Sequence, residues 1–364
     1  MPDQTLAALS SFSAFPGAES GDISRTLPPD LFQPRLLKER EAVESYGFWI
    51  QGEDGSTLFI NLLISNLGRQ HQPGIQLTWY GPERPGESVE RLEGHQEFAS
   101  SLLRVQPSRI SFGPNKLEQH PDGSYSIQFA LPCSQGGELA GSLRLRRGLP
   151  LYRRGDGKIH LDQNRRHFEL VVLQARGPVE GMLQLRGKGI PFRGLGYLDR
   201  TAQNVWSHYL ARRWFNYRFF SQDLCIACTS MTTPPRYGSM PLSHMLVSRG
   251  DEPLFATDQH ALELLKPKPD PASSYLLPTA LSSSAAGDGF RVDLKLEALR
   301  PLDCLDLLED LNPILRTLVR AFIARPYTWR YRAPAQVHLQ PHGSSAIPTV
   351  HHGTLVAELI HVNS

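Results

Sequence analysis

Apolar and polar residues alternate over short stretches through most of the chain after residue 45, and this period is typical of β-strands. Asp54-Gly55 is a hairpin dipeptide between strands expected at Tyr46–Ile50 and Ser56–Asn66. A long polar loop is expected at Gly81–Gly94. The other predicted strands are Ile75–Tyr80, Tyr125–Leu131, Leu139–Arg147, His167–Gln174, Glu180–Arg186, Trp214–Phe220, Leu224–Thr232, Ser243–Ser248, Ser274–Leu281, Phe290–Leu299, Tyr327–Ala333, Gln336–Leu339 and Gly353–Val362. Many short strands separated by turns indicate an all-β fold of barrels or sandwiches.

The segment from Leu302 to Ala324 breaks this pattern. Its apolar residues recur at intervals of three and four, as on one face of a helix: Leu308, Leu311, Leu315, Leu318 and Phe322. Acidic residues come first and arginines last, which complements the helix dipole, and Pro313 is expected to kink the helix or restart it. We therefore predict one C-terminal amphipathic helix, which either packs on a sheet or covers the mouth of a barrel.

A chain of 364 residues is long enough for two domains. We expect an N-terminal strap at residues 1–45, one domain at 46–190 and a second at 191–364. The strap is rich in Pro, Ser and Gly, and its stretch Leu6–Phe15 fits either a short surface helix or a disordered terminus. With 30 Gly and 29 Pro, the chain favours turns over long helices.

Charge and cysteine usage exclude several classes of protein. The formal net charge is +2, which gives no electrostatic footprint for nucleic acid. Four cysteines form no disulfide framework, and Cys225 and Cys228 would point to opposite faces of a strand. No apolar run reaches the length of a membrane-spanning helix. We therefore expect a cytoplasmic protein with no cofactor, no metal and no nucleic-acid partner.

Arginines gather in two groups, one at residues 144–154 and one at residues 212–218. They fit either a solvated strand face or a surface for anionic lipid, so peripheral contact with membranes stays open.

Aromatic residues are concentrated between positions 206 and 220, where seven of fifteen residues are Trp, Tyr or Phe. On a strand that begins at Trp214, Asn216 shares a face with Trp214 and Phe220, whereas Phe215, Tyr217 and Phe219 take the other face. Both faces would be apolar, as in the wall of a barrel. Core packing and an apolar ligand pocket both fit this pattern.

This window resembles the fungal survival-factor family, which is lipocalin-like and implicated in ceramide transfer. His208, Trp214 and Phe219 match the family's His-(x5)-Trp-(x4)-Phe spacing, and the residues 233–238, TPPRYG, match the segment that follows. Similar landmarks lie in the family's order at residues 48–50, 59–68, 179–181, 190–194, 277–279 and 325–331. The resemblance therefore covers most of residues 46–364.

The resemblance implies two lipocalin-like β-barrel or sandwich domains, and a protein that carries a hydrophobic lipid of the sphingolipid, ceramide or isoprenoid type, with a role in stress survival. An eight-stranded barrel has room for one small ligand. The side chains expected to line or gate the pocket, or to contact a head group, are Trp49, Asn61, Tyr197, Trp206, His208, Tyr209, Trp214, Phe215, Asn216 and Phe219.

A related group implies a different function. Residues 196–199, GYLD, resemble the Gly-Tyr-x-Asp of carotenoid 1,2-hydratases, which share the two-domain fold with fungal Diels–Alderases. Under this hypothesis Asp199 would protonate a polyene, since a carboxyl in an apolar pocket has a raised pKa and can donate a proton. Tyr197 would orient the Asp199 carboxyl. A turn-capping role for Asp199 is the structural alternative. A scaffold with fully packed barrels is the third hypothesis.

Overall fold

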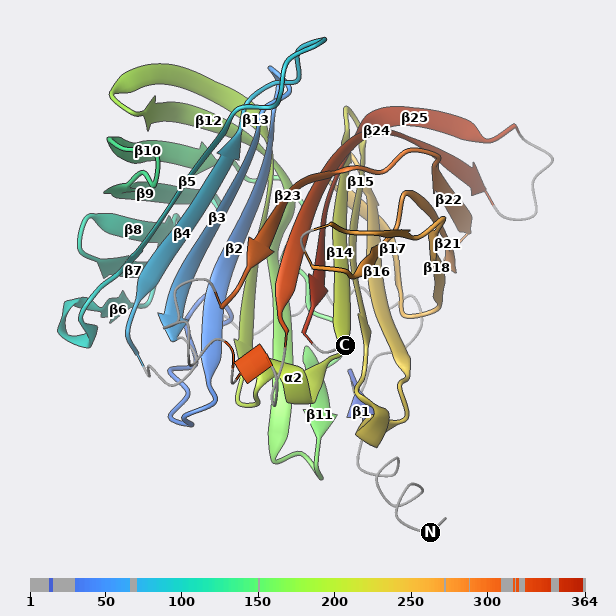
Figure 1. The fold of residues 1–364 in the computed structure, drawn as a ribbon, viewed down its shortest axis with the longest axis horizontal. Helices are drawn as coiled ribbons and strands as arrows, with labels where there is room; N and C mark the ends of the chain where they lie inside the picture. The colour runs from blue at the N-terminus through green and yellow to red at the C-terminus, as the bar shows by residue number, and fades with distance from the viewer. Residues whose placement is uncertain are drawn as a thin grey trace. The chain divides into compact units, whose positions relative to one another are not determined.

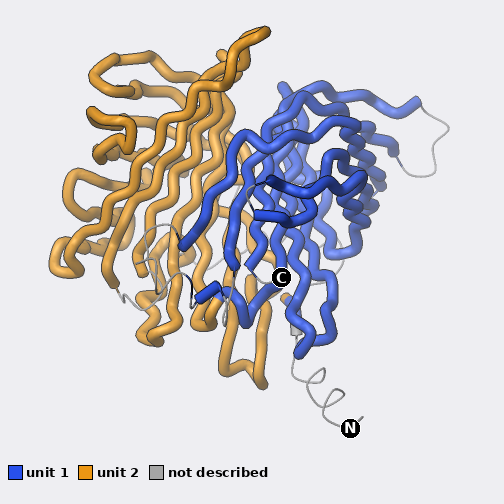
Figure 2. Tube along the Cα trace, in the orientation of Figure 1, with its two compact units in different colours: residues 1–14, 19–23, 207–364 blue, residues 15–18, 24–206 orange. Residues whose placement is uncertain are grey.

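The computed structural model contains two compact units: the first consists chiefly of residues 24–206, and the second consists of residues 207–364 together with N-terminal residues that include Ser13 and Ala14 (Figure 2). The boundary expected at residue 190 falls inside strand β13 (Lys188–Gln203), which pairs with strands of the first unit on both of its edges and so belongs to that unit. The structure describes residues 13–15, 30–65, 71–149, 151–271, 273–287, 289–308, 317, 319–320, 325–341 and 347–362.

A sheet of thirteen strands forms the first unit, in the order β5-β4-β3-β2-β13-β12-β10-β9-β8-β7-β6, with β11 and β1 at its margin (Figure 1). The strands that precede β13 are β1 (Ser13–Ala14), β2 (Val43–Gly52), β3 (Thr57–Ser65), β4 (Gly74–Tyr80), β5 (Arg91–Glu97), β6 (Arg104–Gln106), β7 (Arg109–Phe112), β8 (Asn115–Gln119), β9 (Tyr125–Pro132), β10 (Glu138–Leu145), β11 (Lys158–Leu161) and β12 (Arg166–Leu185). A short helix, η1 (Ser100–Leu102), precedes β6.

The second unit is built on a sheet in the order β17-β16-β15-β14-β25-β24-β22-β21-β18, with β23 on β24, and a separate pair β19-β20. Its elements are α2 (Ser207–Leu210), β14 (Arg213–Ser221), β15 (Leu224–Thr232), η2 (Pro235–Tyr237), β16 (Pro241–Arg249), β17 (Glu252–Thr257), β18 (His260–Leu265), β19 (Lys268–Pro269), β20 (Leu276–Leu277), β21 (Ala280–Gly287), β22 (Phe290–Leu296), β23 (Pro301–Asp306), β24 (Tyr327–Pro341) and β25 (Thr349–His361).

The two sheets repeat one plan. In each, four consecutive antiparallel strands form a meander, and the first of them also pairs with the last strand of the unit: β2 with β13, and β14 with β25. Both sheets curl, so that β5 comes close to β9 in the first and β17 comes close to β21 in the second. Gly94 allows the first approach, because a Cβ there would lie 2.2 Å from the Pro132 carbonyl oxygen. The prediction of an all-β fold with two barrel-like units is confirmed.

Each unit has its own apolar core, built from the side chains that alternate strands direct inward. In the first unit Phe48, Ile60 and Leu198 belong to a cluster of fully buried residues. In the second unit Phe215, Tyr217 and Trp329 belong to another. A complete core in each unit explains why two sheets form instead of one.

Several predicted strands are longer or begin earlier than expected. His167–Gln174 and Glu180–Arg186 are parts of one strand, β12, whose alternation is interrupted by bulges between Val172 and Gly177. Tyr327–Ala333 and Gln336–Leu339 are likewise one strand, β24. The loop expected at Gly81–Gly94 ends earlier, because β5 begins at Arg91. The polar strands β6, β7 and β8 were not predicted.

The expected helix at Leu302–Ala324 is wrong in its first part. Residues Pro301–Asp306 form strand β23, because pairing with β24 from Tyr327 to Tyr331 satisfies their backbone. Residues 309–316, 318 and 321–324 lie outside the described residues, while Thr317, Val319 and Arg320 are helical. In the described part of the chain, no helix is long and apolar enough to cross a membrane.

The described end of the predicted strap, residues 30–45, is anchored to the first unit. Leu31 and Phe32 are buried in its core. Arg35 donates to both carboxylate oxygens of Glu169, at 3.0 and 3.1 Å, and Arg200 donates to the same carboxylate at 2.9 Å. Arg200 and Glu169 are almost completely buried, so these two arginines and the carboxylate form an internal ion cluster. Most of the stretch Leu6–Phe15 lies outside the described residues; Ser13–Ala14 is strand β1.

Candidate functional site

Strand β14 sends its aromatic side chains to two faces, as its alternation predicts. Phe215 and Phe219 lie in the closed core of the second barrel. Trp214 and Asn216 point to the opposite face and are half-buried. The buried Asn216 Oδ1 has no hydrogen-bond partner among the described residues. The structure therefore separates four residues that the sequence analysis grouped in one pocket.

A cavity of about 210 Å³ opens into the second barrel at the start of β14. Phe215 lies on its wall, and strands β15, β16 and β18 supply most of the rest. The Ser243 hydroxyl donates to the Ser230 hydroxyl at 2.9 Å on one side of the cavity. The lining residues are Arg213, Phe215, Ser230, Met231, Thr232, Pro241, Ser243, His260, Leu262 and Leu264. Half of these residues are apolar and half are polar, so the wall is more polar than that of a typical small-molecule site.

His260 brings a polar cluster to this cavity. Its Nε2 lies 3.4 Å from the Cys228 sulfur, while its buried Nδ1 has no hydrogen-bond partner in the described part of the chain. Nearby in the same core, the hydroxyls of Tyr217 and Ser283 are 2.7 Å apart. A buried polar atom without a hydrogen-bond partner is unusual, and this one belongs to a residue that lines the cavity.

Burial keeps this cluster uncharged. It lowers the pKa of His260 to about 4, with His244 adding a smaller effect in the same direction. It raises the pKa of the Cys228 thiol to about 12 and raises the pKa of Tyr217 well above its usual value. A neutral thiol and a neutral imidazole do not form an activated nucleophile–base pair, which needs a thiolate. The cluster suits recognition of a neutral polar group.

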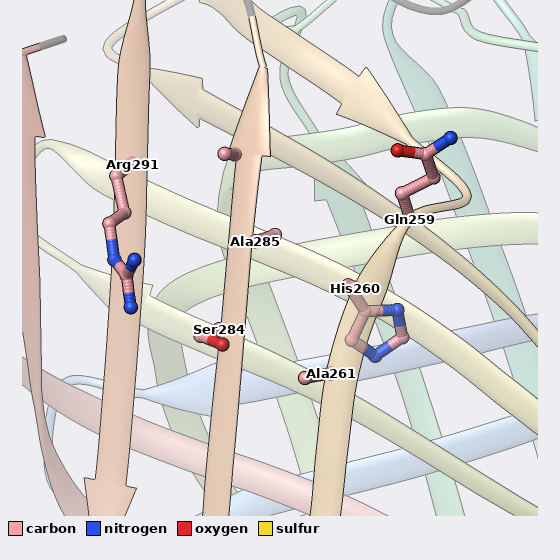
Figure 3. Close-up of a pocket in the computed structure, with 7 residues that line it drawn as sticks. Gln259, His260, Ala261, Ser284, Ala285 and Arg291 are labelled. Carbon is pink, nitrogen blue, oxygen red and sulfur yellow. The ribbon is translucent and has the colours of Figure 1, made fainter.

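Figure 3 shows a second hollow, which is shallow and lies beside His260. Gln259 directly precedes β18 and His260 begins it, Ser284 and Ala285 come from β21, and Arg291 comes from β22. The Arg291 guanidinium is paired with Asp293 at 2.7 and 2.9 Å. This hollow lacks the enclosing wall of the first cavity.

In the first unit, Trp49, Asn61, Tyr197 and Asp199 lie on one face of the sheet, opposite the apolar core. Trp49 is directly across from Tyr197 on one side and from Phe59 on the other, and its ring meets that of Phe59 edge-on at 5.1 Å. Asp199 lies across from Gly47, and Asn61 lies across from Gly47 on the next strand. The structure thus brings these four predicted residues onto one surface.

Gly47 makes room for the Asp199 carboxylate. A Cβ at position 47 would lie 2.9 Å from Asp199 Oδ1, which is closer than such atoms normally approach. Both Asp199 and Tyr197 are buried, and both have contacts with other residues. The turn-capping role considered for Asp199 does not apply, because the residue lies within β13.

The remaining predicted residues lie at the start of the second unit or just before it. His208 and Tyr209 are on α2 with ring centroids 4.2 Å apart, and Trp206 precedes this helix. Burial, followed by the charge of Arg236, lowers the pKa of His208. Among the described residues, no three His, Cys, Asp or Glu side chains gather as metal ligands would.

Sequence reasoning missed most of the cavity. Of the predicted residues, Phe215 alone lines it. Ser230 and Ser243 face inward on predicted strands, so their alternation was a usable signal. His260 and Leu264 come from β18, whose approach to β16 across the barrel is a long-range contact that a single sequence does not reveal.

Comparison with models of known protein families identifies the family of this chain. The Svf1 family model matches residues 32–363, which is nearly the whole chain. The chain belongs to the Svf1 family. The predicted resemblance to the survival-factor family is therefore confirmed.

Two curated relatives align with part of the chain. The ceramide-binding protein svf1 of Schizosaccharomyces pombe is 24% identical over 173 residues, 45% of this chain and 46% of that protein. The ceramide-binding protein svf-1 of Neurospora crassa is 24% identical over 166 residues, 44% of each chain. The alignment thus spans about half the length of the relatives that it matches.

Solved structures share the fold. Kievitone hydratase from Nectria haematococca superposes with a TM-score of 0.58 at 12% identity, covering 96% of this chain and 99% of that one. At this identity the likeness shows a shared fold alone.

Proposed function

We propose that this protein binds a ceramide-type lipid, with the cavity of the C-terminal barrel holding its polar end. Membership of the Svf1 family carries the proposal, since relatives in that family are named as ceramide-binding proteins. The described cavity supports it independently, because its wall combines five apolar side chains with the hydroxyls of Ser230, Thr232 and Ser243 and with His260.

The chemistry of the wall suits an uncharged head group. A ceramide head carries hydroxyls and an amide, which donate and accept hydrogen bonds without charge. Ser230 and Ser243 can do either, and His260 Nδ1 can accept or donate according to its tautomer. Arg213 at the rim would donate to a carbonyl oxygen.

The size of the cavity sets how much of the lipid it takes. At about 210 Å³ it is smaller than the roughly 300–1,000 Å³ typical of pockets for whole small molecules. It would therefore hold one end of a two-chain lipid and leave the rest in contact with other surfaces. Carriage of the lipid between membranes is part of the proposal.

A cavity-filling variant tests this function. Leu264 lines the cavity, and Leu264→Trp would occupy about the volume that a head group needs. Titration with a fluorescent ceramide delivered from cyclodextrin should show at least tenfold weaker binding. Glu263→Trp is the matched control, because the neighbouring Glu263 is exposed on the opposite face of β18 and should leave binding unchanged.

Two results would contradict the proposal. The first is wild-type protein that binds no ceramide and carries no lipid when native mass spectrometry is applied directly after purification. The second is Leu264→Trp protein that is folded and binds ceramide as well as the wild type.

A further inference from the structure

We propose that the end of the C-terminal barrel where the cavity opens docks onto an anionic lipid bilayer. This inference rests on the proposed function, because it supplies the surface from which the lipid would enter. We call this surface the open end and define it by three apolar side chains, Met240, Leu276 and Leu307, and three basic ones, Arg212, Lys268 and Arg325.

Backbone pairing brings these loops to one end of the barrel. Arg213, the first residue of β14, pairs with Thr232 at the end of β15 and with His361 at the end of β25. Arg212 and Met240 flank the same ladder, since the Arg212 amide donates to the Thr232 carbonyl and the Met240 amide to Thr233 Oγ1. The cavity opens here, next to Arg213.

The loop around Leu276 reaches this end through Tyr275. The Tyr275 ring packs on His361, with centroids 4.6 Å apart, and its hydroxyl donates to the Arg325 carbonyl at 2.9 Å. Leu307 joins the same group, because its amide donates to the Pro326 carbonyl at 3.2 Å. Segments that are far apart in the sequence therefore meet around the cavity.

The apolar residues of the open end are unusually exposed. Met240, Leu276 and Leu307 are 42%, 59% and 54% exposed. They are three of the nine most exposed large apolar side chains in the described part of the chain. Such clustering marks an interaction surface, whereas single exposed apolar residues need no explanation.

The charges around these side chains select the partner. Arg212, Lys268 and Arg325 are exposed. Of the acidic groups nearby, Asp306 is paired with Arg320, whereas Asp270 accepts hydrogen bonds from Ser273 and keeps its charge, so the basic residues outnumber the unpaired acid. Exposed apolar tips among basic side chains are the pattern of a surface that inserts into an anionic interface. If the protein stayed in solution, the lipid's acyl chains would be exposed to water on their way from the bilayer to the cavity. Docking of the open end on the bilayer lets the lipid enter the cavity directly.

Vesicle flotation with the full chain tests the proposal. Wild-type protein should float with vesicles of phosphatidylcholine and 30% phosphatidylserine (roughly a plasma-membrane-like anionic surface) and much less with phosphatidylcholine alone. Replacing Leu276 and Leu307 by Asp should weaken partitioning at least tenfold, about the effect of losing one buried leucine. Each basic residue changed to Gln at 212, 268 or 325 should weaken it about fivefold.

Matched controls come from the same barrel. Val350→Asp alters a side chain that is 44% exposed on β25, far along the ladder from the open end. Arg249→Gln, Arg291→Gln and Lys295→Gln remove basic residues from strand positions away from it. These variants should bind vesicles as the wild type does, and circular dichroism should show all variants folded.

The outcomes separate this proposal from the proposed function. Open-end variants should still bind ceramide delivered from cyclodextrin while failing to extract it from vesicles. Vesicle binding that survives the open-end substitutions, or that does not depend on anionic lipid, overturns the docking proposal. A dimer in sedimentation velocity that the same substitutions dissolve overturns it too, because the partner would then be a second copy. Loss of ceramide binding by the wild type would overturn the proposed function alone.

Discussion

The Nε2 atom of His260 lies 3.4 Å from the Cys228 sulfur inside the C-terminal barrel. Both residues are kept neutral by burial, which lowers the pKa of the imidazole to about 4 and raises the pKa of the thiol to about 12. This pairing adds a neutral polar group beside the cavity, and the burial of His260 makes the stability of the barrel sensitive to acid.

Stability should fall as the pH is lowered from about 6.5 to about 4. An unfolded histidine titrates near 6.5, so in this window the unfolded chain binds more protons than the folded one. The shift of His260 corresponds to a loss on the order of 3 kcal/mol in the free energy of unfolding. Urea unfolding at a series of pH values would measure it.

His260→Gln tests this prediction, and His352→Gln is its matched control. The His260 variant should lose about 3 kcal/mol of the decrease in unfolding free energy between pH 6.5 and pH 4. The His352 variant should not, because His352 is exposed. His361, whose pKa burial also lowers to about 4, would account for acid sensitivity that remains. An unchanged slope in the His260 variant would contradict the assignment.

Cys228 should resist alkylation in the folded protein. With a pKa of about 12, the buried thiol holds almost no thiolate at pH 8, and the thiolate is the reactive form. Iodoacetamide followed by peptide mapping should modify Cys304 first, since that residue is half-buried, although burial raises its pKa to about 11. Cys228 should react at a comparable rate after unfolding in urea. Fast labelling of Cys228 in the native state would refute the neutral pair.

Gly47→Ala should destabilise the first unit by about 1–3 kcal/mol, because the added Cβ would crowd the Asp199 carboxylate. The double variant Gly47→Ala, Asp199→Ala should recover most of that loss relative to Asp199→Ala alone, since the crowded atom is gone. Thermal unfolding of the four proteins gives the coupling free energy. Additive effects would show that the two residues do not interact.

Arg200→Met should cost about 3–5 kcal/mol of unfolding free energy, because it leaves Glu169 buried without the better-buried of its two arginines. Arg35→Gln should cost less, since Arg35 is partly exposed and solvent screens its pairing with the same carboxylate. Denaturant titration of both variants gives the comparison. Equal losses would argue against a role for burial.

The sequence predicted elements well where alternation was unbroken. Strand β15 has the predicted bounds Leu224–Thr232, and β14 extends the prediction Trp214–Phe220 by one residue at each end. Strand β12 was divided because its bulges interrupt the period. The segment at Pro301 was misassigned because pairing with β24 outweighed a helical spacing that continues beyond it.

Site prediction succeeded within strands and failed across the barrel. Trp49 and Asp199, which the sequence analysis assigned to different domains, share a face of the first sheet because β13 pairs with β2, a long-range pairing that alternation does not reveal. Phe215, His260 and Leu264 line one cavity because of the way the sheet closes into a barrel. Alternation carries no information about that closure.

The pairing of first and last strands has a consequence for synthesis on the ribosome. Strand β2 is synthesised by Gly52, but its partner β13 is complete only at Gln203. Strand β14 likewise has no partner on that edge until β25 is complete at His361. Each barrel therefore keeps one open edge until its final strand has emerged, and unpaired edges of this kind attract other strands. The N-terminal barrel can close while the second is still being translated, so the nascent chain need expose the edges of only one unfinished barrel at a time.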